Sequence, residues 1–187
     1  MKKVILIIFV LVITSIVIIF SNNVKTYVQG ENRSLNQNIY NFLEDVGNRK
    51  DVYGAAIKLN KGSSANTCVY FIAEVLRHNN FKVPEETSNI EQILPLLEKD
   101  GLKKQRNYEK LMPGDICFTT DGKGDKNGMP THTYVFMKWV KEGNYDYAYI
   151  CDNQAKDYKG KVYHIRNINV IDRSNGFDKD AFAFFME

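Results

Sequence analysis

The spacing of apolar positions indicates helices in the first half of the chain and strands in the second. Between residues 35 and 99, apolar side chains recur every three or four residues, which places them on one face of a helix. Val46 belongs to the apolar face of the first helix, and Pro95 lies inside the last, where a kink or a break is expected. We expect helices over residues 35–46, 52–59, 68–78 and 89–99.

From residue 111 onward the apolar period shortens to two, which is typical of strands. We expect strands over residues 116–119, 131–140, 145–152, 161–166 and 181–186. A polar segment rich in Gly, residues 121–130, separates the first two strands and is expected to form a mobile rim of a cleft. Helices followed by an antiparallel meander make an α+β domain in which the N-terminal helices pack on the sheet.

A long apolar run precedes this domain. Residues 4–20 are aliphatic or Phe apart from two small hydroxylated residues, and this is about the minimum length that crosses a hydrocarbon core. Two lysines before the run, against one close behind it, favour an N-terminus inside the cell. A cleaved secretory peptide is the alternative, and it also leaves the domain outside. We expect a single-pass transmembrane signal-anchor over residues 1–20, a spacer over 21–33 and an extracytoplasmic domain over 34–187.

The charge of the chain limits its partners. The formal net charge is +3, and it falls to +1 without Lys2 and Lys3. Because the remaining charges are interspersed without a basic run, we expect no nucleic-acid partner. No Cys or His pattern has zinc spacing, and a calcium loop over residues 123–134 would need acids where Lys123 and Tyr134 stand. We expect neither a metal nor a cofactor.

Cys68 is the strongest candidate for chemistry. It follows a polar segment, residues 62–67, in which Asn66 or Thr67 can serve as a helix N-cap, and it opens an apolar helical run. A thiol in the first helical turn is stabilised as a thiolate by the helix dipole and by free N–H groups. The alternative is an ordinary buried Cys. Of the other two thiols, Cys117 and Cys151, the sequence leaves open whether they pair or stay free.

Three histidines compete as the base for Cys68. His78 lies ten residues further along the same helix, about 15 Å away along its axis, and cannot reach the thiol. His164 lies in an alternating strand and remains a candidate. His132 begins a strand directly after a loop, where a side chain can face a cleft while the sheet fixes its backbone. We favour His132 as the general base.

A third group should orient the imidazole, and the end of the next strand supplies two candidates. Period-two alternation puts Ala148, Ile150 and Asp152 on one face and Asn153 on the other. We expect the face that carries Ala148 and Ile150 to pack against the helix of Cys68. That expectation favours Asp152 as the third residue, with Asn153 as the alternative.

Four segments together resemble the NlpC/P60–CHAP group of papain-like cell-wall hydrolases: residues 66–71, 111–118, 131–135 and 149–153. The resemblance implies a papain-like fold in which Cys68 is the nucleophile, His132 the base and a polar residue orients the base. It also implies amide bonds of peptidoglycan as substrate. The family usually reads Asp-Cys-Ser-Gly at the nucleophile, whereas this chain reads Thr67-Cys68-Val69-Tyr70.

The sequence therefore predicts a membrane-anchored, extracytoplasmic cysteine amidase or endopeptidase that acts on peptidoglycan peptides. A catalytically inactive papain-like module, used for binding or assembly in an envelope complex, is the alternative from a different class. Acyl transfer to or from lipid on the same fold is a third reading. Protein partners cannot be named from the sequence.

Overall fold

The computed structural model describes residues 14, 17–18 and 35–187. The chain divides into two compact units, Met1–Ser34 and Leu35–Glu187, and only the second is described in detail. The expected anchor over residues 1–20 lies outside the described residues except for Thr14, Val17 and Ile18, which are helical. Within the described part of the chain, no helix has both the length and the apolar character needed to span a membrane.

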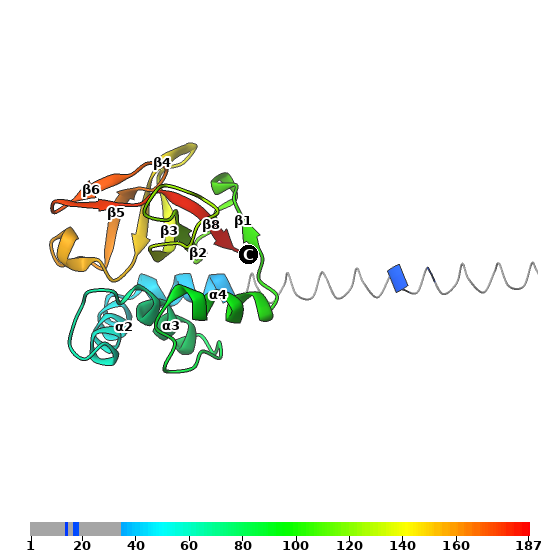
Figure 1. Cartoon of the computed structure of the whole chain (residues 1–187), viewed down its shortest axis with the longest axis horizontal. Helices are drawn as coiled ribbons and strands as arrows, with labels where there is room; N and C mark the ends of the chain where they lie inside the picture. The colour runs from blue at the N-terminus through cyan, green and yellow to red at the C-terminus, as the bar shows by residue number, and fades with distance from the viewer. Residues whose placement is uncertain (1–13, 15–16, 19–34) are drawn as a thin grey trace, which may run out of the picture. The chain divides into compact units, whose positions relative to one another are not determined.

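The second unit begins with a layer of helices (Figure 1). A helical segment over residues 35–44 is followed by α2 (Val46–Leu59), α3 (Cys68–His78) and α4 (Ile90–Lys99). Asp45 separates the first two because its side chain accepts a hydrogen bond from the Asn48 N–H at 2.9 Å and so caps α2. The prediction that Val46 lies on the apolar face of the first helix is wrong: Val46 opens α2 and is 57% exposed.

Helix α4 runs through Pro95 as one element. The Pro95 ring is exposed, whereas Ile90, Ile93, Leu94 and Leu97 are buried on the opposite side. A break at Pro95 is therefore not observed, because packing of the apolar face holds the helix together.

The remaining elements form a six-stranded antiparallel sheet with the strand order β1-β8-β2-β3-β4-β5. A separate two-stranded sheet joins β6 to β7. The strands are β1 (Lys104–Gln105), β2 (Ile116–Thr119), β3 (Thr133–Lys141), β4 (Asn144–Cys151), β5 (Tyr163–Asn167), β6 (Asp172–Ser174), β7 (Phe177–Lys179) and β8 (Phe182–Met186). Two short 3-10 helices lie at Tyr108–Lys110 and Ala155–Tyr158. The α+β class and the packing of helices on an antiparallel sheet are confirmed (Figure 1).

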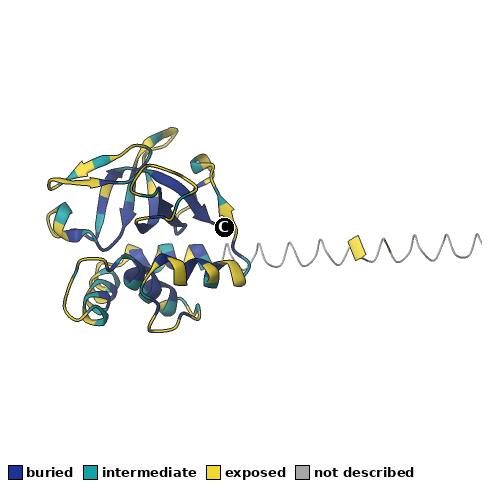
Figure 2. Ribbon diagram, in the orientation of Figure 1, coloured by how far each residue is buried: buried dark blue, intermediate teal, exposed yellow. Residues whose placement is uncertain are grey.

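Buried residues gather where the helices meet the sheet (Figure 2). Helix α3 lies at the centre of this layer, in contact with α2, α4 and β3. The far face of the sheet carries a second apolar cluster that includes Tyr134, Phe136, Ala148 and Ile150. Both faces of the sheet are thus covered by apolar side chains.

The prediction of which face of β4 packs against the helices is wrong. Cys151 packs into the cluster on the helix side, whereas Ala148 and Ile150 belong to the cluster on the far face. The alternation itself is correct, but the face that meets the helices is the opposite one. Apolar residues on both faces of a strand cannot show which face a helix covers.

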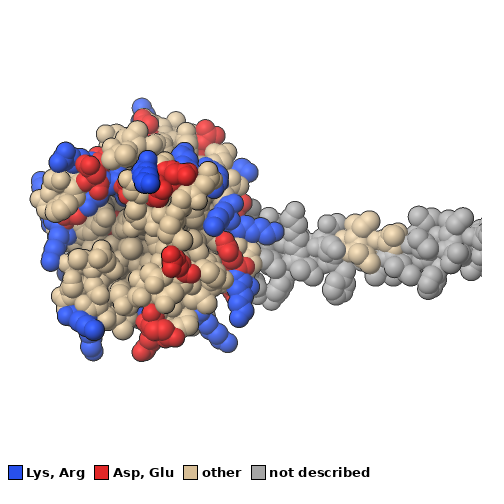
Figure 3. All heavy atoms as spheres, viewed as in Figure 1, with Lys and Arg blue, Asp and Glu red and all other residues tan. Residues whose placement is uncertain are grey.

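On the face of this unit seen in Figure 3, basic and acidic side chains are interspersed, without a field of a single sign. This distribution agrees with the mixed charge of the sequence.

A turn before β2 ties the sheet to the first helical segment. The buried Asp115 carboxylate accepts hydrogen bonds from Asn36 Nδ2 at 2.6 Å and from the Met112 N–H at 2.7 Å. Gly114 has φ 94°, and a Cβ added there would lie 1.9 Å from the Asn36 carbonyl oxygen. Only glycine fits this position, both because of its backbone angle and because of the close approach.

We expect Gly114→Ala to destabilise the domain more than Gly176→Ala. Both glycines have positive φ, but a Cβ at Gly176 meets nothing within 4 Å. Gly176→Ala should cost about 1–2 kcal/mol for its backbone angle, and Gly114→Ala about 1–3 kcal/mol more because the backbone of Asn36 must move. Chemical denaturation measures both; equal losses would show that the contact with Asn36 contributes nothing.

Candidate active site

Cys68 is the first residue of α3, as predicted. The N-cap residue Thr67 makes no capping hydrogen bond with its side chain; its hydroxyl instead donates to the Ser64 carbonyl at 3.0 Å. Among the described residues, no N-cap side chain therefore covers the first-turn N–H groups of α3. Free N–H groups at a helix start favour a negative charge beside them.

His132 directly precedes β3 and is fixed by its neighbour β2. Its backbone N–H donates to Thr119 Oγ1 at 3.0 Å, and its carbonyl accepts from the Thr119 N–H at the same distance. Its side chain is buried, and its Nε2 lies 2.9 Å from Asp152 Oδ2. This bond leaves Nδ1 as the ring nitrogen for a second partner.

The second partner of His132 is Cys68. Burial raises the pKa of the Cys68 thiol, but the hydrogen bond and the charge of His132, together with the Thr133 and Val69 N–H groups, outweigh burial and leave the pKa below its ordinary value. Burial lowers the pKa of His132, but Asp152 and Cys68 outweigh it and raise that pKa to about 9. The two shifts favour the same state, a thiolate beside an imidazolium.

Asp152, which directly follows β4, is the partner of His132 on the side away from Cys68. Burial raises the pKa of its carboxyl group, but His164, His132 and the Gln154 N–H outweigh burial and bring the pKa to about 2. The Gln154 N–H donates to Asp152 Oδ1 at 2.8 Å, while Oδ2 faces His132. Asp152 therefore stays ionised at neutral pH and holds the ring of His132 in one orientation.

Asn153, the alternative third residue, lies on the nucleophile's side instead. Its Nδ2 donates to Thr67 Oγ1 at 3.0 Å and lies 3.5 Å from the Ser64 carbonyl oxygen. The structure thus brings Asp152 to His132 and Asn153 to the turn before Cys68. The sequence placed both residues near the site, but the argument from strand faces that favoured Asp152 was wrong.

The other two histidines do not contact Cys68. His78 is exposed at the end of α3 and stacks on Phe42 with 5.1 Å between ring centroids. His164 is buried behind Asp152, with Nε2 3.8 Å from Asp152 Oδ1 and its ring stacked on Tyr158 at 3.5 Å. Its Nδ1 lies 3.2 Å from the Lys161 carbonyl oxygen.

Sequence reasoning missed Arg166 on β5, and it weighed His164 only as a base for Cys68 and not as a neighbour of Asp152. His164 and Arg166 are buried on one face of β5, while Ile165 between them is 43% exposed. A period-two pattern of buried polar residues was the signal that could have found them.

A cleft passes Cys68 on two sides. One lobe, of about 400 Å³, is lined by Val69, Ile90, Met129 and Pro130 among others. The other lobe, of about 220 Å³, is polar and is lined by His132, Asn153, Gln154, Arg166, Lys179 and Asp180 among others. Both lobes include Asn66, Cys68 and Thr131.

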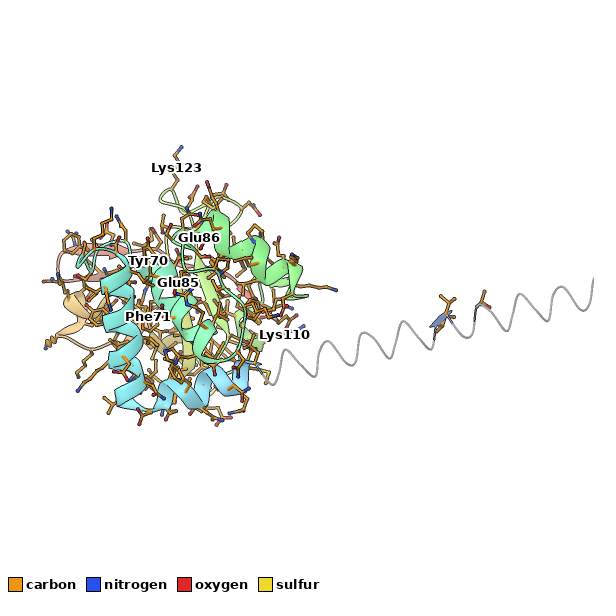
Figure 4. All side chains as sticks on the ribbon, turned by 90° about the horizontal axis from the view of Figure 1, so that it is seen from below. Tyr70, Phe71, Glu85, Glu86, Lys110 and Lys123 are labelled. Carbon is orange, nitrogen blue, oxygen red and sulfur yellow. The ribbon has the colours of Figure 1, made fainter. Side chains whose placement is uncertain are left out.

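The loop between β2 and β3 contributes Met129 and Pro130 to the first lobe and so borders the cleft, while its mobility stays a prediction. Arg106 donates to the Lys126 carbonyl and to Asn127 Oδ1, and Asp121 accepts from two backbone N–H groups within the loop. Lys123, at its tip, extends away from the body of the domain (Figure 4). Within the described part of the chain, no three His, Cys, Asp or Glu side chains are grouped so that they could hold a metal ion.

Cys117 and Cys151 are both free and buried, on opposite faces of the sheet. Burial raises the pKa of each thiol well above its ordinary value. Only Cys68 therefore combines access to the cleft with a lowered pKa.

The rate at which iodoacetamide alkylates Cys68 should rise with pH, and the midpoint of this rise should lie below the ordinary pKa of a thiol. In His132→Ala the midpoint should move above the ordinary pKa, because burial then acts without a compensating positive charge. Mass spectrometry of the Cys68 peptide across pH measures both curves. An unchanged midpoint in His132→Ala would contradict the coupling, and Cys117 and Cys151 should stay unlabelled throughout.

Comparison of the chain with protein-family models, with curated proteins and with solved structures gives no match.

Proposed function

We propose that this protein is a cysteine amidase or endopeptidase that uses Cys68, His132 and Asp152. The observation that supports it most is the grouping of three side chains: the Cys68 thiol at the start of α3, whose pKa His132 lowers, the imidazole of His132, and the buried Asp152 carboxylate 2.9 Å from His132 Nε2. A nucleophile, a base in contact with it and a third group that orients the base are the parts that nucleophilic acyl chemistry needs.

In the proposed reaction, the Cys68 thiolate attacks the carbonyl carbon of an amide, and a C–S bond forms. The tetrahedral intermediate collapses as the C–N bond breaks, and the imidazolium of His132 transfers its proton to the leaving nitrogen. Water, deprotonated by the now neutral His132, then attacks the thioester carbonyl; the C–S bond breaks, the acid leaves, and the Cys68 thiolate and the His132 imidazolium are restored. Asp152 remains ionised throughout and keeps the His132 ring in one orientation while His132 acts first as an acid and then as a base.

The start of α3 is suited to stabilise the charge that develops on the carbonyl oxygen. No side chain caps its N–H groups among the described residues, since the Thr67 hydroxyl is bonded to Ser64. The turn that leads into α3 is held by Asn153 from the opposite layer. Preorganised N–H donors of this kind contribute strongly to catalysis because they need no rearrangement during the reaction.

Peptidoglycan is the proposed substrate, acted on outside the cytoplasm by a protein anchored through residues 1–20. The support for this part is the resemblance of four segments to cell-wall hydrolases, together with the apolar run and its flanking lysines. A cleft with lobes on both sides of Cys68 suits an extended chain that crosses the nucleophile.

A catalytically inactive module for binding or assembly is the second candidate. It is favoured by the replacement of the usual Asp-Cys-Ser-Gly by Thr67-Cys68-Val69-Tyr70. Because Val69 lines the cleft, its presence in place of the family's Ser alters the surface that a substrate would meet.

Cys68→Ala should abolish release of fragments from purified cell wall, whereas Cys117→Ala should leave it largely intact. His132→Ala should reduce the rate about 10²–10⁴-fold, because proton transfer is lost. Asp152→Asn should reduce it less, since an amide oxygen can still accept a hydrogen bond from the ring. His78→Ala, distant from the site, is the matched control.

Mass spectrometry of the released fragments measures these rates. Wild-type protein that releases nothing while Cys68 alkylates rapidly would favour the binding module. Equal losses in Cys68→Ala and Cys117→Ala would indicate a structural role for both thiols.

Protease added to intact spheroplasts should digest residues 35–187, since the anchor is proposed to leave the domain outside. Immunoblotting of the domain measures the loss, with a cytoplasmic protein as the control for lysis. Full protection of the domain would place it inside and remove peptidoglycan as its substrate.

A further inference from the structure

Arg166 on β5 is a buried charge without a carboxylate partner. The residue is 1% exposed, yet among the described residues no Asp or Glu forms an ion pair with it. Its Nη2 donates to the Asp180 carbonyl, whereas Nε and Nη1 have no hydrogen-bonding partner. A buried guanidinium in this state is costly unless something else compensates its charge.

This side chain forms part of the wall of the polar lobe of the cleft, together with Cys68 and His132. Its charge acts on that lobe with little screening, because water does not surround it. The two observations are independent: one is the missing partner of a buried cation, and the other is its place beside the nucleophile.

The other charges of the lobe do not replace it. Lys179 is already neutralised, with Nζ 2.5 Å from Asp157 Oδ2. The Asp180 carboxylate accepts a hydrogen bond from Thr131 Oγ1 and is only partly buried, so water screens it more than it screens Arg166. Asp178 is 68% exposed in its side chain. The Cys68 thiolate and the His132 imidazolium, also in this lobe, carry opposite charges that cancel, so the least screened uncompensated charge of the lobe is positive.

We propose that the polar lobe binds a carboxylate of the substrate, selected by the positive charge of Arg166. This inference rests on the proposed function of Cys68 and adds the class of substrate to it. Since His132 lies in the same lobe and gives its proton to the leaving nitrogen, the carboxylate belongs to the leaving amine. The preferred substrates are then amides whose amine half carries an acid group, while the acyl half lies along Val69 and Ile90 in the other lobe.

Two reagents of nearly equal size test the charge preference without a known substrate. Iodoacetate and iodoacetamide both alkylate Cys68, and they differ in carrying a carboxylate or a neutral amide. The ratio of their rates, measured on the full chain in detergent at pH 7, reports the field at the thiolate. His132 attracts iodoacetate in every variant that keeps it, so the comparison between variants isolates Arg166.

Arg166→Gln should lower the ratio of iodoacetate to iodoacetamide rates about 10-fold, the order expected for one unit charge roughly 10 Å away at an effective dielectric constant of about 20. Arg166→Lys should keep most of the ratio because it keeps the charge. Lys141→Gln is the matched control, since it removes an equal charge from the exposed far end of β3, and Lys141 does not line the lobe. A near-ultraviolet circular dichroism spectrum like that of the wild type shows that a variant is folded.

A ratio unchanged in folded Arg166→Gln would overturn the proposal. If Arg166 serves only to balance Asp152, both reagents should slow or speed together, and the ratio should stay constant. Should Arg166→Gln fail to fold, the wild-type protein still decides the matter: acetate should protect Cys68 from iodoacetamide saturably, and acetamide at equal concentration should not. Equal effects of acetate and of chloride at matched ionic strength would contradict the site.

Failure of the proposed function has a different signature. Slow alkylation of wild-type Cys68 by both reagents would show that the thiol is not activated. Rapid alkylation with a ratio independent of Arg166 would leave the hydrolase proposal in place and remove only the carboxylate site.

Discussion

The contact between Cys68 and His132 joins the two layers of the fold. The thiol stands at the start of a helix, and the imidazole stands at the start of a strand, so the contact exists only when α3 lies correctly on β3. Each of the two shifted pKa values depends on the other residue, because a thiolate stabilises an imidazolium and the reverse. Packing between helices and sheet thereby determines the charge state of the site.

The sheet positions Asp152, the third residue of the site. Asp152 follows β4, whose neighbour β3 begins one residue after His132, so antiparallel pairing brings the end of one strand beside the start of the other. A slip of one residue between β3 and β4 would turn either side chain to the opposite face. Asn153, the next residue, reaches back to Thr67 and fixes the turn that carries the nucleophile. Two adjacent residues thus position the base and the nucleophile separately.

Much of this arrangement could be predicted from local pattern. The bounds of α3 follow from the polar turn before Cys68 and the Asn residues after His78, and the order of helices and strands follows from the change in apolar period. His132 could be selected because only a residue between a loop and a strand combines access with a fixed backbone. These inferences needed only neighbours in the sequence.

The parts that failed depend on contacts between distant segments. The covered face of β4 could not be chosen, because apolar residues on both faces hide which one meets a helix. Strands of two or three residues, such as β1 and β6, are too short to show a period. The alternation of His164 and Arg166 along β5 could have placed them on one face, but their position beside the site depends on the pairing of β5 with β4, which that alternation does not specify.

The protonation of His132 at neutral pH tests the account most directly. Nitrogen-15 NMR of the imidazole distinguishes a ring with two N–H groups from a ring with one, in the wild type and in Cys68→Ala. The account predicts a doubly protonated ring at pH 7 in the wild type, and a lower pKa of His132 in Cys68→Ala, where the thiolate no longer stabilises the cation. A ring with a single proton at pH 7 in the wild type would mean that the thiol keeps its proton, and would contradict the ion pair on which the proposed chemistry depends.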